Sequence, residues 1–558
     1  MVDAVDRRIA LILVLVGPAA TLAISPMWNY EPINLIKVVT ICSASFYCIA
    51  LLLSNPKVTI NQIEKNVLVF TLMFLLAMIS TLIFSGAPIN QQIWGVFGRS
   101  TGFLTYFSFL CLLLSASYVK KKDFYKSLVN SIVLTSIPMT TYCLIQVANL
   151  DPIGWSEKHP FGTLGNINFS SAFFGLSTIC SLALIGERKY SKLLRFSLLV
   201  LIIIDLSIVV STNSIQGLMM FVAGAGIQGF IALQRRFQSK LLSVTYILIG
   251  LFASLITVLG LANKGPLSKF LFAPSIVFRT DYWHAGWAMT LKFPFIGVGL
   301  DSYGDWYRTL RGEISTLRTG PDRISNTAHN IFLDLSSNGG LPLILTYLAL
   351  LVIAFKNGMS ILRNKPSQHY VALFTSWIGF LIFSSISIAQ VGVSIWGWLF
   401  TGALLGIKGI HDSVDAKIEL GNKAKIKRVK RVRTKVLSPR ISLIGILGFL
   451  VGLFLSCIPL QADAKFKNAM NSKAMDQIMN TLKTPGSTAF HQEIALTLAF
   501  NNNLTNQAKT IADDLVHTYP RDFTGWQAIY TSSLSTEAEK ANALRMLIKM
   551  DPYNPSLR

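Results

Sequence analysis

The stretch LLSVTYILIGLFASLITVLGLA, residues 241–262, decides the fold class of this chain, because it runs for 22 residues without a charged side chain. An α-helix needs about 20 consecutive apolar residues to cross the hydrocarbon core of a bilayer. Inside lipid the backbone must satisfy its own hydrogen bonds, which a helix does within one segment. This stretch therefore predicts a membrane-spanning helix.

Runs of the same kind recur along the whole chain of 558 residues, of which 52% are hydrophobic and 14% charged, with a mean hydropathy of +0.51. We place the spans at 9–25, 34–54, 67–85, 101–119, 128–148, 169–186, 194–211, 215–233, 241–262, 331–355, 369–389, 391–407 and 441–460. The run 391–407 follows its neighbour almost directly. The sequence predicts an all-α, polytopic membrane protein with about 12–13 transmembrane helices.

The net charge of +23 comes from basic residues that gather in alternate loops. Positive charge is retained on the cytoplasmic side of short loops, which predicts a cytoplasmic N-terminus. The linker 411–440, with its basic cluster from Lys423 to Arg433, is then cytoplasmic as well. There it sets the topology and attracts anionic membrane lipids, so we expect no nucleic acid as a partner.

Two segments are too long and too polar to be turns, and both fall on the opposite, non-cytoplasmic side. The large loop, residues 263–330, carries eight basic and five acidic residues. The tail, residues 461–558, predicts a small, separate helical domain after a membrane domain at 1–460. Pro520 and Pro552 lie 32 residues apart and each closes a helical segment, which resembles tetratricopeptide repeats. A plain helical cap is the alternative.

The non-cytoplasmic face restricts the chemistry, because neither ATP nor nucleotide sugars reach it. A synthetic enzyme there needs a donor that arrives activated, such as a sugar on a lipid diphosphate. The departing diphosphate must be stabilised by a metal ion or by fixed cations. The sequence has no DxD or HExxH motif, and its six cysteines form no CxxC. We therefore expect no metal and no cofactor, and arginine as the phosphate ligand.

Three stretches on that face supply candidate residues. Arg99 stands just before a span, where it could equally be a snorkelling anchor. Arg279 and Trp283 would share one face of a helix, so the indole could brace the guanidinium; a plain surface helix is the alternative. His329, followed by Asn330, lies directly before the span that begins at residue 331. An imidazole there can accept a proton from a hydroxyl, although a capping histidine would look the same, and His159 and His284 are rivals.

The loop PFGTLGNINF, residues 160–169, leads into another span. Gly162 permits a tight turn. Asn166 and Asn168 either bind sugar hydroxyls or cap the helix that follows.

These motifs together resemble the O-antigen ligase and O-antigen polymerase superfamily, which includes bacterial protein O-oligosaccharyltransferases. GTLGNIN at 162–168 is similar to the family's Gly-Thr-x-Gly-Asn-x-Asn loop. The stretch 279–299, with PFIGVG at its end, is similar to its Arg-rich exterior segment, and Ala-His-Asn at 328–330 is similar to its Ala-His-Asn element. The resemblance covers roughly residues 60–410.

The resemblance implies a metal-independent glycosyltransferase of the GT-C type in the bacterial inner membrane, with its site and tail in the periplasm. The implied donor is a polyprenyl diphosphate-linked glycan, and the acceptor is a glycan, lipid A core or a protein. Family members often carry Ser-Arg-Gly between two central spans, whereas this chain has no arginine in STNSIQG at 211–217. Gln216 and Arg99 are the candidates to replace it. Arg279 with Arg99 would hold the diphosphate, while His329 activates the acceptor hydroxyl.

Two other functions remain as alternatives. The tail favours protein O-oligosaccharide transfer slightly, because a helical repeat can bind a protein. A transporter of inorganic carbon or another solute would also be polytopic. Ionisable residues within the spans are few, essentially Lys37, Asp205 and Asp334, whereas coupled transporters usually place such groups at mid-membrane.

Overall fold

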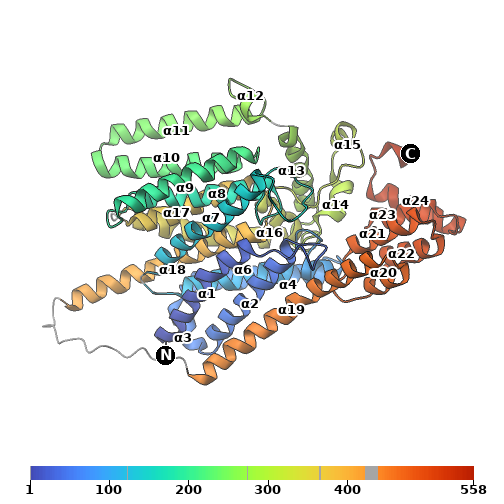
Figure 1. Ribbon diagram of the computed structural model, residues 1–558, viewed down its shortest axis with the longest axis horizontal. Helices are drawn as coiled ribbons and strands as arrows, with labels where there is room; N and C mark the ends of the chain where they lie inside the picture. Colours follow the sequence, from blue (N-terminus) through green and yellow to red (C-terminus); the bar gives the residue numbers. More distant parts are fainter. Residues whose placement is uncertain (1, 122, 273, 364–365, 422–437, 558) are drawn as a thin grey trace.

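The computed structural model describes residues 2–121, 123–272, 274–363, 366–421 and 438–557. Within these ranges the protein is all helical (Figure 1), and the prediction of a polytopic all-α membrane protein is confirmed. The basic cluster from Lys423 to Arg433 lies outside the described residues, so its cytoplasmic placement stays a prediction.

Each of the thirteen predicted spans falls on a helix. The helices are α1 (Val2–Leu22), α2 (Asn34–Leu53), α4 (Lys65–Phe84), α6 (Phe103–Tyr118), α7 (Phe124–Val147), α8 (Ile167–Ile185), α9 (Lys192–Ser211), α10 (Gln216–Phe237), α11 (Lys240–Leu261), α16 (Ile331–Leu362), α17 (Gln368–Ile386), α18 (Val391–Gly421) and α19 (Pro439–Ser472). Ten of them, among the described residues, are long and apolar enough to cross a membrane. Helix α6 and the apolar part of α18 are shorter, and α1 begins with charged residues.

Burial separates central from peripheral helices. The apolar stretch of α8 is 78% buried inside the protein, whereas that of α11 is only 6% buried although it is strongly apolar. A helix that is apolar all round and unburied needs lipid as its surroundings. We infer that α11 lies at the lipid-facing edge of the bundle and α8 in its centre.

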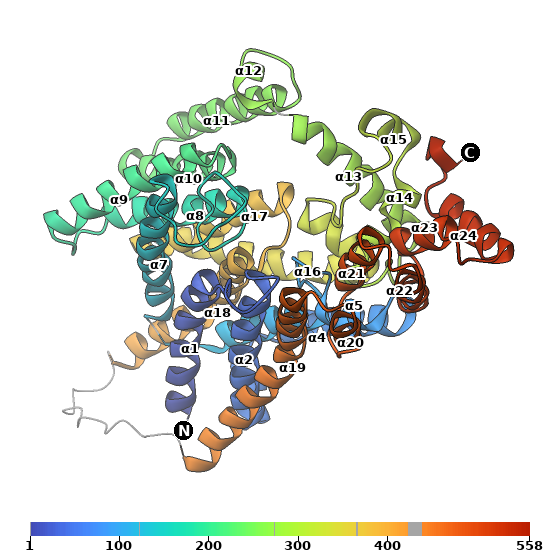
Figure 2. The same ribbon diagram turned by 45° about the vertical axis from the view of Figure 1, so that its right-hand side comes forward.

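The large loop forms four helices at one end of the bundle, namely α12 (Ser268–Leu271), α13 (Pro274–Lys292), α14 (Tyr303–Leu310) and α15 (Glu313–Thr319). The tail helices lie at the same end (Figures 1 and 2). They are α20 (Met475–Leu482), α21 (Ala489–Asn501), α22 (Thr505–Thr518), α23 (Phe523–Thr531) and α24 (Glu537–Met550), followed by the 3₁₀ turn η1 (Pro555–Leu557). The short helix α3 (Pro56–Gln62) lies between α2 and α4, and the short helix α5 (Ile89–Trp94) lies between α4 and α6.

Helix α19 passes without a break from the bundle into the tail, so the boundary predicted at residue 460 falls inside one helix. The tail has a hydrophobic cluster of its own, with Phe466 from α19 and Leu515 from α22 among its buried members. The division into two domains and the tetratricopeptide resemblance stay predictions.

Helix α16 is broken at Gly340, which has a φ of +73° and a ψ of −178°. The motif 294–299 fills the break. Leu341 N donates to Pro294 O at 2.6 Å and Val298 N donates to Ser337 O at 2.9 Å. A side chain at Gly340 would collide with the backbone of Phe295. This backbone contact holds the first part of α16, and with it the residues just before that helix, against the large loop.

Candidate active site

The loop between α5 and α6 carries Arg99 and is held by a buried aspartate of the large loop. Asp301 Oδ2 accepts hydrogen bonds from Val96 N at 2.8 Å and Thr101 N at 3.3 Å, and Oδ1 accepts one from Thr101 Oγ1 at 3.0 Å. Gly95 has a φ of +87°, and a Cβ there would lie 2.5 Å from Asp301 Oδ2. Only glycine therefore fits this turn. The carboxylate of Asp301 accepts hydrogen bonds from the loop backbone on both sides of Arg99.

Arg99 is enclosed but incompletely paired. Its Nη1 is buried and has no hydrogen-bond partner among the described residues. Burial lowers the pKa of Arg99, while the nearby carboxyl groups of Asp301 and Asp334 raise it. An arginine keeps its charge through shifts of this kind, so the loop presents a cation with an unused donor.

Helix α13 supplies the second cation, Arg279. Burial lowers the pKa of Arg279, and the nearby Tyr282 raises it. Among the described residues neither Arg279 nor Arg99 forms an ion pair. No cation–π contact joins Arg279 to Trp283 in the described part of the chain, and Trp283 Nε1 is buried without a partner. The expected bracing of Arg279 by the indole is therefore absent from this structure.

His329 occupies a tight turn directly before α16, with a φ of +52°. Its backbone N–H donates to Thr327 Oγ1 at 3.0 Å, and its ring stacks on Tyr282 with the centroids 5.2 Å apart. The next residue, Asn330, caps α16 by accepting from Phe332 N and Leu333 N. The capping role thus belongs to Asn330, and the imidazole of His329 is left for the site.

Electrostatic contact joins His329 to both arginines. Burial, then Arg99 and then Arg279 lower the pKa of His329 to about 3. The imidazole is therefore neutral at physiological pH and able to accept a proton. Two arginines from well-separated parts of the sequence thus act electrostatically on one imidazole, and we call Arg99, Arg279 and His329 the cationic site.

Asp334 completes this region from the first turn of α16. Its Oδ1 accepts a hydrogen bond from Ala328 N at 2.7 Å, which fixes the turn that carries His329. No sequence pattern predicted that Asp301 would lie beside Arg99 or that Asp334 would hold the turn of His329. The positions of Asp301 shortly after PFIGVG and of Asp334 shortly after AHN were the only sequence features that pointed to these two residues.

The other predicted residues form a neighbouring group at the starts of α8 and α10. Asn166 caps α8 by accepting from Asn168 N at 2.9 Å, and Asn168 Oδ1 accepts from Ser214 Oγ at 2.8 Å. Gln216 is buried, and its Oε1 has no partner in the described residues. Gly162 has a φ of +56°, and a Cβ there would meet Met139 Sδ at 2.6 Å.

This group connects to the cationic site through the start of α2. A Cβ at Gly165 would lie 3.0 Å from Ile33, and the next residue, Asn34, donates from Nδ2 to Gly98 O at 2.8 Å. The Gly162 loop and the Arg99 loop therefore flank the same short segment. His159, a rival of His329, lies beside this neighbouring group, where it contacts Asn213 at 3.3 Å, and the other rival, His284, is exposed.

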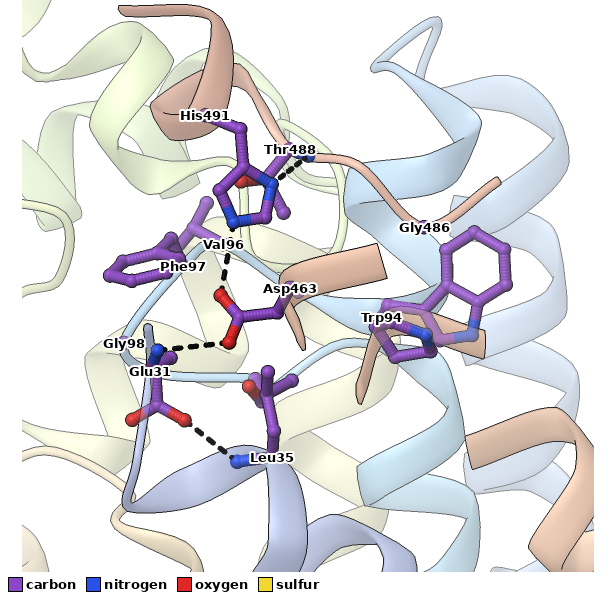
Figure 3. Close-up of a pocket in the computed structure, with 13 residues that line it drawn as sticks. Glu31, Leu35, Trp94, Val96, Phe97, Gly98, Asp463, Gly486, Thr488 and His491 are labelled. Atoms are coloured by element: carbon purple, nitrogen blue, oxygen red, sulfur yellow. Dashed lines mark hydrogen bonds and ion pairs between the residues drawn. The ribbon is translucent and has the colours of Figure 1, made fainter. Parts of the chain in front are cut away.

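The tail contacts the loop that carries Arg99, and in the close-up His491 and Asp463 lie next to Phe97 and Gly98 (Figure 3). Phe97 also stacks on Phe490, with the ring centroids 4.1 Å apart. Asp463 of α19 accepts from Tyr30 N at 2.7 Å and Glu31 N at 3.0 Å, and contacts His491 Nε2 at 3.0 Å. The tail is thus in direct contact with the loop that presents Arg99.

Ser487, His491 and Asp463 resemble a hydrolytic triad in composition but not in function. Ser487 Oγ lies 3.5 Å from His491 Nδ1, yet that nitrogen accepts the backbone N–H of Thr488 at 3.2 Å. A nitrogen that accepts a backbone hydrogen bond is not available to deprotonate a serine. Instead, Asp463 of α19 contacts His491 of α21 and accepts from the backbone before α2, so these residues join the tail to the bundle.

No group of three or more His, Cys, Asp or Glu residues in the described ranges is arranged to hold a metal ion. No curated protein matches the chain in sequence. Residues 170–348, about a third of the chain, match the family described as O-antigen ligase. The matched segment begins in α8 and ends in α16, so it includes Arg279, His329 and Asp334. The central third of the chain is therefore similar to the O-antigen ligase family.

Proposed function

We propose that this protein transfers a glycan from a polyprenyl diphosphate carrier to an acceptor hydroxyl on the periplasmic face of the bacterial inner membrane. The family match supports glycan transfer of the O-antigen ligase or polymerase type in general. The observation that carries the specific proposal is the meeting of Arg99, Arg279 and His329. Two guanidinium groups that form no ion pair within the described ranges both act electrostatically on the neutral imidazole of His329.

The two arginines suit a diphosphate. A guanidinium donates two parallel hydrogen bonds to phosphate oxygens and keeps its charge. As the bond between the anomeric carbon and the phosphate oxygen breaks, its electron pair passes to the diphosphate. Fixed cations stabilise that added charge without reorganisation. Arg99 and Arg279 therefore lower the barrier to departure, and no metal ion is required.

His329 suits the acceptor. Its neutral imidazole takes the proton of the acceptor hydroxyl while the hydroxyl oxygen attacks the anomeric carbon, which is inverted. With a pKa of about 3, the imidazole is a weak base while the site holds no anion. The negative charge of a bound diphosphate would offset Arg99 and Arg279 and raise that pKa. The base becomes effective when the donor is in place.

The experiment is transfer of a labelled glycan from a polyprenyl diphosphate to an acceptor by purified protein in detergent. Purified wild-type protein transfers the label, whereas His329→Ala and Arg279→Ala do not, although both accumulate normally. Supplying lipid A core, a lipid-linked glycan or a Ser/Thr peptide as the acceptor distinguishes ligase, polymerase and protein transferase. Normal transfer by either variant would refute the role of that residue, and solute uptake without transfer would favour the transporter.

A further inference from the structure

A cavity of about 140 Å³ lies between the bundle and the tail, close to the cationic site. Trp94 and Phe97 line it from the loop that carries Arg99. Asn326 lines it from the turn that carries His329, three residues further on. Glu493 and Asp522 line it from the tail. The segments that carry Arg99 and His329 thus form two walls of this cavity.

Carboxyl groups dominate the polar lining. Glu493 and Asp522 are hydrogen-bonded to each other, and burial with the repulsion of Asp522 raises the pKa of Glu493 to about 8. Burial also raises the pKa of Asp305, a third lining residue, to about 7. Glu493 and Asp305 therefore keep their protons to a higher pH than exposed carboxyl groups do, and in that form they both donate and accept hydrogen bonds.

The same lining disfavours anions. No Lys or Arg of the described residues lines the cavity. A phosphate or a uronic acid would lose its hydration beside three carboxyl groups and gain no cation in exchange. The cavity is therefore unsuited to the donor diphosphate and to phosphorylated parts of an acceptor.

A sugar ring without negative charge fits this chemistry. Side-chain carboxyl and amide groups hydrogen-bond to sugar hydroxyls, and aromatic side chains pack on the apolar C–H face of a pyranose. Amides come from Asn90 and Asn326, and aromatic surface comes from Trp94 and Tyr519. Trp94 Nε1 donates to Leu455 O at 3.3 Å, which holds the indole in place.

The cavity is also linked to Arg99 by hydrogen bonds. Asp305 Oδ2 accepts from Gln91 Nε2 at 2.9 Å, and the same nitrogen donates to Asp301 O at 3.1 Å. Asp301 in turn grips the loop on both sides of Arg99. A ligand that contacts Asp305 is therefore linked through Gln91 to Asp301, the residue that positions Arg99.

We propose that this cavity is the acceptor subsite, which binds one uncharged or cationic sugar ring of the acceptor next to the hydroxyl that His329 activates. The proposal rests on the transferase function proposed above. It gives the tail a role in acceptor binding, because Glu493, Asp522 and Tyr519 come from the tail. It also predicts selection against acidic sugars at that ring.

The test uses the full-length protein in detergent and two probes, neutral N,N′-diacetylchitobiose and the acidic disaccharide digalacturonic acid. Saturation-transfer NMR measures the binding of each. The variants are Glu493→Ala, which removes a lining group, and Ala489→Leu, which fills the cavity from the start of α21. Glu537→Ala is the matched control, because Glu537 is exposed and, within the described part of the chain, forms its one ion pair with Lys540 of the same helix.

Chitobiose is expected to bind the wild-type protein and the control, and to bind each cavity variant about fivefold more weakly or worse, the usual loss when a hydrogen bond between neutral groups is removed. Digalacturonic acid is expected not to compete. In transfer assays the cavity variants raise the acceptor KM by a similar factor and leave the donor KM unchanged. Equal chitobiose binding by folded Glu493→Ala and Ala489→Leu would overturn the proposal, as would absence of chitobiose binding or equal competition by the acidic disaccharide.

The two proposals fail separately. Chitobiose binding that depends on Glu493 in a protein that transfers no glycan would uphold the subsite and overturn the transferase function. Transfer that requires His329 but has the same acceptor KM in both cavity variants would uphold the function and overturn the subsite.

Discussion

Asp301 of the large loop and Arg99 of the α5–α6 loop lie beside each other, with the carboxylate of Asp301 bonded to the backbone on either side of the arginine. The aspartate thereby positions a guanidinium that comes from 202 residues earlier in the chain. The large loop therefore contributes to the site in two ways, by carrying Arg279 and His329 and by holding Arg99.

Replacing Asp301 by Ala is expected to lower glycan transfer about a hundredfold, the usual effect of misplacing a catalytic group by about 1 Å. The three hydrogen bonds to the loop are lost, so Arg99 is no longer held. The measurement is kcat/KM for labelled-glycan transfer. Asp476→Ala, at an exposed position of α20, is the control. Unchanged kcat/KM in Asp301→Ala would show that the loop keeps its position unaided.

Replacing Arg99 or Arg279 by Lys is expected to lower kcat by about a hundred- to a thousandfold, or roughly 3 to 4 kcal/mol of transition-state stabilisation. Lysine retains the charge but not the two parallel donors. The KM for the donor changes less than kcat, because the missing interaction is strongest when the diphosphate departs. A loss confined to KM would mean that the arginines bind the donor without stabilising its departure.

The protein is expected to lose stability as the pH falls from about 6.5 towards 3, in part because of His329. The folded state keeps this histidine neutral, with a pKa of about 3, whereas the unfolded chain protonates it below about 6.5. Between pH 6.5 and pH 3 the unfolded state thus binds a proton that the folded state does not. The contribution of His329 to the free energy of unfolding is therefore complete above pH 6.5 and declines as the pH falls through this window. His329→Gln should show a smaller fall in melting temperature between pH 7 and pH 4.5 than the wild type. Identical falls would mean that burial does not depress this pKa.

Separating Arg311 from Asp551 is expected to loosen the tail from the large loop. Arg311 Nη2 lies 2.7 Å and 2.8 Å from the two oxygens of Asp551, and both side chains are fully buried. Removing one partner of a buried pair costs about 3 to 5 kcal/mol. Asp551→Ala should therefore lower the melting temperature and expose the tail to limited proteolysis. Lys540→Ala, which breaks an exposed pair, should change neither, and equal behaviour of the two variants would contradict the docking role.

Glycan transfer is expected to continue in the presence of EDTA. The two guanidinium groups supply the positive charge that a metal ion would otherwise provide. The measurement is the initial rate of transfer by purified protein before and after chelation, with and without added Mg²⁺. Loss of activity on chelation, restored by Mg²⁺, would contradict the metal-independent mechanism.

The bundle was predictable from the sequence, because a span must be helical and apolar over a fixed length. The run at 241–262 therefore coincides with α11 within a residue or two. The motifs around residues 279, 294 and 328 predicted where the polar end of the bundle lies. The capping role of Asn166 was one of two open readings, and the structure shows that cap.

The arrangement of the candidate site and the docking of the tail depend on contacts between distant parts of the chain. The hold of Asp301 on the Arg99 loop, the insertion of PFIGVG into the break of α16 and the stacking of Phe97 on Phe490 have no local signature. Helical spacing placed Arg279 and Trp283 on one face, whereas in the structure the indole packs against the hydrophobic cluster that includes Tyr303. Such pairings are decided by which elements meet, which periodicity alone does not specify.

The most direct test is a cryo-EM structure of the purified protein with a prenyl diphosphate bound. The account predicts that the diphosphate lies within hydrogen-bonding distance of both Arg99 and Arg279, with the imidazole of His329 facing the position of the attached sugar. A diphosphate bound at another place in the bundle, with Arg279 and His329 turned away from it, would contradict the account.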